Sequence, residues 1–287
     1  MLTNLFDGIA YGMLLFVISC GLSVTLGLMN LINLAHGAFA MAGGYATVVL
    51  VNKLGVPFFA ALPMAFVISA LIGLLLERTL YIHIYKRSHL DQVMFSIGLV
   101  FMAMSGAGWL LGTEQVFINL PAYLTQRFEV GGLFSIGAYR LLIIVVCGAL
   151  AAVLQFAVAR TRFGARLRAA VDDPTVARGL GINVDFVFAV TFAVGSGLAG
   201  LGGALGAELL GLDPTFPVKF MVYFLIVVAV GGSAGMTGPL VAALLLGVAD
   251  VTGKYYLPEA GAFIIYIVMI AVLLWRPQGL FARAGGR

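Results

Sequence analysis

The feature that most restricts the fold of this chain is the length of its uncharged stretches. Gly8 to Asn52 contains no Asp, Glu, Lys or Arg, and Phe220 to Ala249 contains none either. A transmembrane helix needs about 20 mostly apolar residues, because the hydrocarbon core of a bilayer is about 30 Å thick. Only 10% of the residues are charged and the mean hydropathy is +1.10, whereas soluble domains carry about 25% charged residues. The sequence therefore predicts an all-α, polytopic transmembrane helix bundle.

Apolar runs separated by polar joints predict eight or nine spans in a single transmembrane domain over residues 1–287. We expect two helices within Gly8–Asn52 joined near Asn30–His36, then Val56–Leu76 ending at Glu77 and Arg78, Gln92–Gly112, Leu141–Ala159, Phe186–Ala207, two shorter segments within Phe220–Ala249, and Ala260–Trp275. The first run lacks a basic segment before it, so we interpret it as a retained span rather than a cleaved signal peptide. Small residues fill Phe186–Ala207, which predicts a helix in the middle of the bundle.

The basic residues indicate the orientation. Segments 77–91, 160–185 and the tail from 276 together hold eleven of the sixteen Lys and Arg residues. Cytoplasmic loops carry the excess of positive charge, so these three segments are predicted to be cytoplasmic. Nine crossings with the N-terminus outside follow, while an eight-crossing version with one re-entrant or merged segment stays open. Membrane lipid and topology thus account for the basic pI, and no nucleic-acid partner is expected.

Residues 160–185 form a polar, arginine-dense segment between two apolar runs. Asp173 can cap a helix, Pro174 suits its first position and Gly181 suits a left-handed stop just beyond its end. We therefore predict a short helix from about Pro174 to Leu180. Such a cytoplasmic helix could receive force from a soluble partner. The alternative, a solvated loop that only fixes topology, stays open.

Polar residues at membrane depth are the candidates for a transport pathway. Asn30, Asn33 and His36 recur every three residues between the first two spans, and intramembrane polar groups are costly unless they pair or face water. A structural role in hydrogen bonding to neighbouring helices is the competing interpretation. The Gly231–Pro239 interruption predicts an unwound joint whose free backbone groups could face a cavity. One histidine without a nearby carboxylate or cysteine predicts no metal site.

The sequence does not predict an enzyme. No nucleophile, zinc or P-loop motif accompanies the three histidines, and Cys20 and Cys147 lie in apolar runs where they suit packing. Carboxylates within the spans are missing apart from Glu77, Glu208 and Asp250, which we place at span ends. This weakens a proton-coupled transporter, which usually needs an ionisable relay at depth. A pathway that takes its energy from outside the chain is favoured.

Four ordered motifs are similar to a known family. They are Gly21–Phe39 followed by Gly43-Gly44-Tyr45, the segment Thr161–Ala170 with Asp172-Asp173-Pro174 and Gly181–Val184, the run Gly231–Pro239, and the ending Trp275–Phe281. Together they resemble the permeases of branched-chain amino-acid ABC importers, over nearly the whole chain. Ala165 departs from the Arg or Lys expected after Gly164, which puts the docking contacts in doubt and not the family.

The resemblance implies a permease subunit of an ATP-driven importer in a bacterial-type inner membrane. Its partners would be a second related permease, two cytoplasmic ATPase subunits that bind the ATP, and a periplasmic or lipid-anchored binding protein; no cofactor is expected in this chain. The implied coupling residues are Arg162, Gly164, Arg166, Arg168, Asp172, Asp173, Pro174 and Gly181. The implied pathway residues are Asn30, Asn33, His36, Gly43, Gly44, Gly231, Gly232, Gly235 and Pro239.

Two alternatives stay open at this point. Relatives carry urea, short-chain amides and other amino acids, so the substrate does not follow from the resemblance. An autonomous channel or secondary carrier for a small polar solute is a further alternative, which transport by the chain alone without ATP would reveal.

Overall fold

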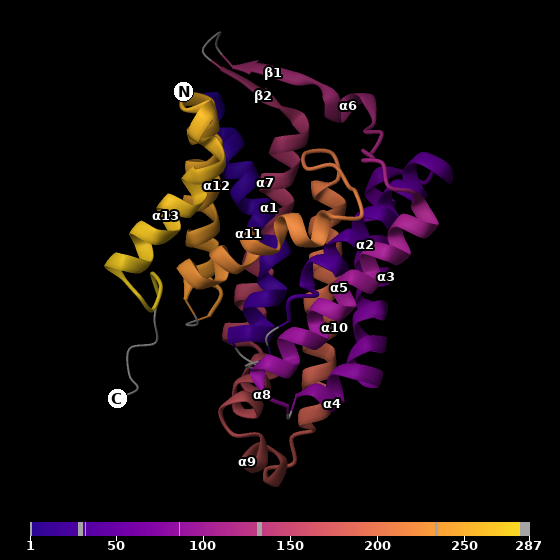
Figure 1. The fold of residues 1–287 in the computed structure, drawn as a ribbon, viewed down its shortest axis with the longest axis vertical. Coiled ribbons are helices and arrows are strands. Elements are labelled where there is room, and N and C mark those ends of the chain that lie inside the picture. The colour runs from indigo at the N-terminus through magenta and orange to yellow at the C-terminus, as the bar shows by residue number, and fades with distance from the viewer. Residues whose placement is uncertain are drawn as a thin grey trace.

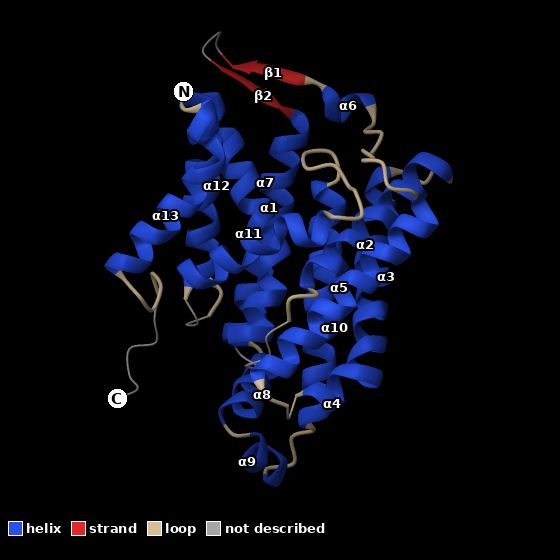
Figure 2. Ribbon diagram, in the orientation of Figure 1, coloured by secondary structure: helices blue, strands red, loops and turns tan. Residues whose placement is uncertain are grey.

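The computed structural model describes residues 2–27, 31, 33–85, 87–130, 134–232 and 235–281, and these residues form a bundle of helices along one long axis (Figures 1 and 2). The helices are α1 (Leu2–Gly27), α2 (His36–Val48), α3 (Phe58–Leu76), α4 (Ile82–Ile84), α5 (His89–Leu111), α6 (Ala122–Thr125), α7 (Ala138–Arg160), α8 (Arg162–Asp172), α9 (Pro174–Gly179), α10 (Val184–Gly206), α11 (Phe216–Gly231), α12 (Thr237–Tyr256) and α13 (Gly261–Trp275). Two π-helical turns, η1 (Val49–Lys53) and η2 (Glu77–Tyr81), and the 3₁₀ turn η3 (Pro258–Ala260) extend or join them.

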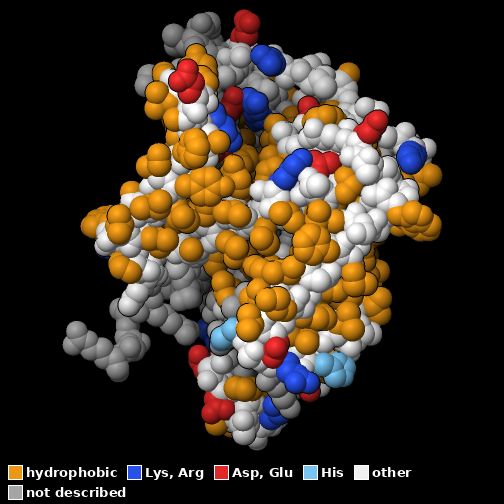
Figure 3. Space-filling view, viewed as in Figure 1, with side chains coloured by type: hydrophobic (Ala, Val, Ile, Leu, Met, Phe, Trp, Pro, Cys, Tyr) orange, Lys and Arg blue, Asp and Glu red, His pale blue; other side chains and the backbone are white. Residues whose placement is uncertain are grey.

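The membrane-spanning character predicted from the sequence is confirmed. Seven helices within the described residues are long and apolar enough to cross a bilayer, whereas α2 has 13 residues and α11 has 16. Apolar side chains cover the middle of the molecule, and charged side chains gather toward its two ends (Figure 3). The predicted count of eight or nine crossings stays a prediction.

Helices α1 and α10 occupy the centre of the bundle. Seventeen of the 23 residues of α10 are buried, and α10 packs against α1, α2 and α3. Glycines allow this close approach, since a Cβ atom on Gly203 would overlap the carbonyl oxygen of Ala40 on α2. The central position predicted for this helix from its small residues is confirmed. Helices α5, α7 and α13 surround the centre and bury few of their residues.

Two predicted helix ends are wrong. The third span does not end at Glu77, because the helix continues through η2 and α4 to Ile84 and buries Glu77, whose carboxylate accepts a hydrogen bond from Tyr85. The segment expected to stop at Ala249 continues as α12 to Tyr256, so Asp250 lies inside this helix and not at its end. In each case a charged residue is accommodated by a partner, so its charge does not terminate the helix.

A small hairpin departs from the all-helical prediction. Strands β1 (Arg127–Val130) and β2 (Phe134–Gly137) pair antiparallel, with Arg127 opposite Gly137 and Val130 opposite Phe134. The hairpin lies at the end of the molecule that also holds the N-terminus, and α9 lies at the other end (Figure 2). It occupies the long connection between α5 and α7, which the sequence indicated only as polar.

Candidate functional site

Helix α9 closes one end of the molecule and has the capping predicted from its sequence. The Asp173 carboxylate accepts hydrogen bonds from the backbone N–H groups of Thr175, at 2.8 Å, and Val176, at 3.0 Å. Pro174 occupies the first turn, and Gly181 follows the helix with φ +82°. The positive φ is one that glycine adopts without steric cost. The predicted short helix is therefore confirmed, with its end at Gly179.

Helix α8 precedes α9 and was not predicted. Thr161 caps it by accepting a hydrogen bond from the Gly164 N–H at 3.2 Å. Its buried Leu167 and Ala170 pack with Ala177 of α9 and with Val184 and Val187 of α10 in a second, smaller hydrophobic core. The apolar residues of α8 recur at helical spacing, and this periodicity is a signal that could have revealed the helix.

Two of the predicted coupling residues attach α8 to the end of α7. A Cβ atom on Gly164 would overlap the carbonyl oxygen of Val158, and the Arg168 guanidinium donates a hydrogen bond to the same oxygen. The other predicted coupling residues are exposed at the surface; they are Arg162, Arg166, Asp172, Asp173, Pro174 and Gly181. Gly164 and Arg168 therefore position α8, while the remaining residues lie on the outer surface formed by α8 and α9.

The outer surface of this element contains two apolar side chains that the sequence analysis missed. Val176 is 57% exposed and Leu180 is 75% exposed. Beside them Arg178 forms an ion pair with Asp185, at 2.9 Å between Nη2 and Oδ1. Apolar side chains surrounded by polar and charged residues are typical of protein–protein contacts. We call this surface the docking face. It consists of Val176, Leu180 and the exposed coupling residues Arg162, Arg166, Asp172, Asp173, Pro174 and Gly181.

Asn33 and His36 lie in the interior and bind neighbouring elements. The Tyr81 hydroxyl of η2 donates a hydrogen bond to Asn33 Oδ1 at 2.8 Å. The His36 ring places Nε2 2.6 Å from the carbonyl oxygen of Ile18 on α1. These contacts favour the structural interpretation of the two residues, and their part in transport stays a prediction. The third member of the series, Asn30, lies outside the described residues.

The predicted pathway glycines fall into two groups. Gly43 and Gly44 of α2 face the bundle interior, where a Cβ atom on Gly43 would overlap the backbone of Gly200 on α10. Gly231 packs against Pro239, since an added Cβ would lie 2.5 Å from its nitrogen. The second group, Gly232 and Gly235, lines a cavity.

Gly232 and Gly235 line a cavity of about 480 Å³ between the ends of α1, α7, α11 and α13 and the joint before α12. Its wall also contains Ser23 of α1 and Leu273 of α13. Backbone groups left free by an interrupted helix are tolerated at membrane depth where they line such a cavity. The geometry thus agrees with the cavity expected at the interruption, and the passage of a solute through it stays a prediction.

A larger cavity, of about 640 Å³, lies between α2, α3 and α5. Its wall is mainly apolar and includes Phe39, Ile72, Leu99 and Met102, with Tyr45 at one side. No pattern in the sequence indicates this cavity, because its residues come from separate apolar segments that each resemble an ordinary membrane span.

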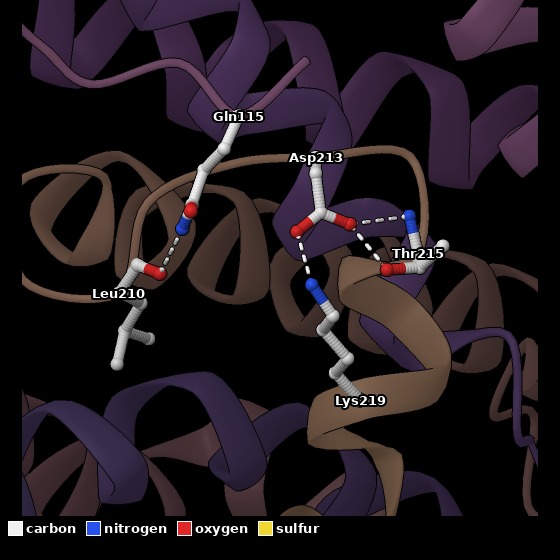
Figure 4. A network of polar contacts seen from close by, with 5 residues as sticks. All are labelled: Gln115, Leu210, Asp213, Thr215 and Lys219. Carbon is white, nitrogen blue, oxygen red and sulfur yellow. Dashed lines mark hydrogen bonds and ion pairs between the residues drawn. The ribbon is translucent and has the colours of Figure 1, made fainter. Parts of the chain in front are cut away.

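The end of the molecule opposite α9 is held by a polar network (Figure 4). The loop after α10 exchanges two backbone hydrogen bonds with the loop after α5, between Val116 and Leu212, and Gln115 donates to the Leu210 carbonyl at 3.1 Å. Asp213 accepts hydrogen bonds from the Thr215 N–H at 2.8 Å and from Lys219 Nζ at 2.5 Å. These bonds join the two loops to each other and to the start of α11.

The Asp213 network predicts a dependence on pH. Burial opposes ionisation of Asp213, but the hydrogen bonds from Lys219 and Thr215 outweigh it, so the pKa of the carboxyl is lowered. Because the folded-state pKa is lowered, the stabilisation is complete above the unfolded value of about 3.9 and is lost as pH falls through the folded value. Asp213→Asn should destabilise the protein by about 1–2 kcal/mol at pH 7, and this difference from wild type should shrink as pH falls below the unfolded value.

Thermal unfolding in detergent, compared at pH 7 and near pH 3, measures this effect. Glu114→Gln is the matched control, because Glu114 is an exposed carboxylate at the same end of the molecule. A destabilisation by Asp213→Asn that persisted unchanged in acid would contradict the assignment of the effect to the carboxylate charge.

Comparison with known proteins shows similarity over nearly the whole chain. The family model described as "Branched-chain amino acid transport system / permease component" matches residues 4–273. The "Probable branched-chain amino acid transport permease protein LivH" of Methanocaldococcus jannaschii is 26% identical over 95% of this chain and 90% of its own length. The "High-affinity branched-chain amino acid transport system permease protein LivH" of Salmonella typhimurium is 27% identical over 98% of this chain and 96% of its own length.

A second permease of that bacterium is also similar. Salmonella typhimurium "High-affinity branched-chain amino acid transport system permease protein LivM" is 23% identical over 93% of this chain and 68% of its own length. No solved structure shows significant similarity to the chain. The sequence relatives are transport permeases by name and not enzymes.

Proposed function

The chain belongs to the family of permease components of branched-chain amino acid transport systems, and from this premise we propose that it is the transmembrane subunit of an ATP-driven importer. It is a multi-pass protein of the inner membrane. Its proposed solutes are leucine, isoleucine, valine or related amino acids, the class named in the descriptions of its relatives. Urea or short-chain amides are the second candidate class of solute.

The observation that carries the coupling proposal is the firm attachment of the docking face to the bundle. Helix α8 binds the end of α7 through Gly164 and Arg168. The shared core of α8, α9 and α10 joins the same element to the most buried helix of the molecule. A displacement of α9 is therefore transmitted to α7 and α10 together. In our proposal an ATPase subunit binds the docking face and moves these helices during its ATP cycle.

The proposed orientation places α9 in the cytoplasm and the N-terminus outside, with nine crossings. Asp7 near the start of α1 pairs with Arg140 near the start of α7. Asn52 of η1 donates to the Phe117 carbonyl at 2.9 Å, in the loop after α5. Helix α1 starts at the end of the molecule opposite α9, and η1 ends there. The chain therefore crosses inward as α1 and returns outward as α2 with η1.

Helices α11 and α12 support a second pair of crossings in the same way. Helix α11 begins after the Asp213 loop at the outer end and leads inward. Helix α12 leads back to the outer end, where its Asp250 lines the same recess as Asp7 of α1. Helix α13 then leads the chain inward to the basic tail. Both short helices, α2 and α11, are thus proposed to cross the bilayer with their neighbouring turns.

The proposed importer includes partner proteins that hydrolyse ATP and deliver the solute. The similarity of this chain to both LivH and LivM supports pairing with a second, related permease. The sequence contains no P-loop, so two ATPase subunits are proposed to supply ATP hydrolysis. A substrate-binding protein outside the membrane is proposed to deliver the solute, since the predicted pathway residues include no fixed charge.

Purification of the tagged chain from its native membrane, followed by reconstitution, tests the proposal. We expect two ATPases, a second permease and a binding protein to co-purify, and we expect uptake of leucine, isoleucine or valine by the reconstituted assembly only with ATP. Urea and short-chain amides serve as competing solutes in the same assay. Transport by the chain alone without ATP would contradict the proposal and favour an autonomous channel or secondary carrier.

A further inference from the structure

A polar recess lies at the outer end of the bundle, between α1, α7, α11 and α12. Its volume is about 440 Å³, within the range of about 300–1,000 Å³ that is usual for small-molecule sites. The side chains that carry polar groups into its wall are Asp7, Tyr11, Arg140, Tyr223, Asp250 and Lys254. In the space-filling view, acidic and basic side chains gather at this end of the molecule (Figure 3).

The charged groups of the recess form two pairs of opposite sign. Asp7 of α1 pairs with Arg140 of α7, and Asp250 pairs with Lys254 one turn later on α12, at 2.6 Å between Oδ2 and Nζ. The recess wall therefore carries two carboxylates and two cations, with no net formal charge. An ion with a single charge gains little from such a wall, whereas a solute with separated positive and negative groups can face both kinds of charge.

Asp250 is the member of this set whose hydrogen bonding is incomplete. The residue is 1% exposed, and its Oδ1 atom has no hydrogen-bond partner among the described residues. A buried charged acceptor without a partner is energetically costly. Lys254, by contrast, is half exposed and partners only the other oxygen. Asp250 nevertheless contributes to the wall of the recess, so an ammonium group seated there would give the buried carboxylate a second partner.

We propose that this recess is a low-affinity subsite for the zwitterion of an amino acid. The ammonium group of the solute donates to Asp250 Oδ1, and its carboxylate faces Arg140 and Lys254. Tyr11 and Tyr223 line the same recess as Asp250 and border the ammonium position. The inference rests on the proposed function and extends it, because it gives the permease itself a site that recognises the solute backbone.

The position of the recess agrees with this role. Its lining residues lie near the start of α1, the start of α7 and the end of α12. These helix ends are opposite α9 (Figure 1), on the side from which an importer receives its solute. The contacts engage the ammonium and carboxylate groups common to all amino acids and leave the side chain free. The subsite therefore accepts a class of solute, while selection among amino acids rests with the proposed binding protein.

Binding of radiolabelled L-leucine to the assembled permease–ATPase complex in nanodiscs, without the binding protein, tests the inference. We expect millimolar binding to the wild type, weakened about tenfold or more by Asp250→Asn, which corresponds to about 1.4 kcal/mol. Glu259→Gln is the matched control, because Glu259 is an exposed carboxylate just after α12 and outside the recess wall. Unchanged leucine binding in an Asp250→Asn variant that assembles normally would overturn the subsite.

A competition experiment on the wild-type complex needs no variant to fold. Leucinamide lacks the carboxylate and 4-methylpentanoate lacks the ammonium group, so both should compete with leucine at least about tenfold more weakly than unlabelled leucine does. Equal competition by either analogue, or no saturable leucine binding, would overturn the zwitterion site. Uptake with the binding protein present is measured in parallel. Intact leucine uptake combined with either of these results leaves the proposed function standing, whereas absence of any amino-acid uptake removes the proposed function itself.

Discussion

Replacing Gly164 by valine is expected to reduce uptake by the assembled importer at least about tenfold while the chain remains in the membrane. A Cβ atom at this position would overlap the carbonyl oxygen of Val158 and lie 2.7 Å from that of Ala157. Both are backbone atoms at the end of α7, so α8 must move away from α7. The hydrogen bond from Arg168 to the Val158 carbonyl is then lost as well.

The neighbouring substitution Ala165→Val is the matched control. Ala165 is exposed on the same helix, so the control introduces the same β-branched side chain without the overlap. Valine has a higher intrinsic helix propensity than glycine and a lower one than alanine, so a loss of uptake confined to Gly164→Val cannot come from helix propensity. Uptake of labelled leucine, membrane abundance and co-purification of ATPase subunits are measured for both variants. Normal uptake by Gly164→Val would show that the attachment of α8 to α7 does not transmit the movement.

The elements that could be predicted from the sequence are those with local causes. The caps of α9 lie within nine residues of one another, from Asp173 to Gly181, and each acts on backbone groups beside it. The central place of α10 follows from its own small residues. In contrast, the continuation of the third span past Glu77 depends on partners such as Tyr85, whose contact with the carboxylate exists only once the chain is folded.

The candidate sites show the same division. Periodicity identified Asn33 and His36 as unusual, but their partners Tyr81 and Ile18 could not be inferred, because no local rule joins positions so far apart in the sequence. The polar recess gave no motif at all. Its charged residues come from α1, α7 and α12. The unpartnered Oδ1 atom of Asp250 is buried only because α12 continues past Ala249, where the charge of Asp250 suggested that the helix ends.

Gly43→Val is expected to prevent the bundle from folding to its normal yield. The added Cβ would overlap the backbone of Gly200, and neither helix can relieve that overlap by a side-chain rotation. Overpacking of this kind costs about 1–3 kcal/mol and sometimes more, and here it separates α2 from the central helix α10. We expect the yield of monodisperse protein after detergent extraction to fall at least about fivefold.

Gly148→Val on α7 is the control, because no atom lies within 4 Å of the Cβ it would introduce. Extraction yield, thermal unfolding in detergent and uptake distinguish the two roles that remain for Gly43. A low yield of Gly43→Val beside a normal yield of Gly148→Val indicates helix packing, the role that the contact with Gly200 supports. If Gly43→Val instead folds and unfolds like the wild type but the importer carries no solute, packing is excluded as the reason for glycine, and the position belongs to the transport pathway that the sequence predicts.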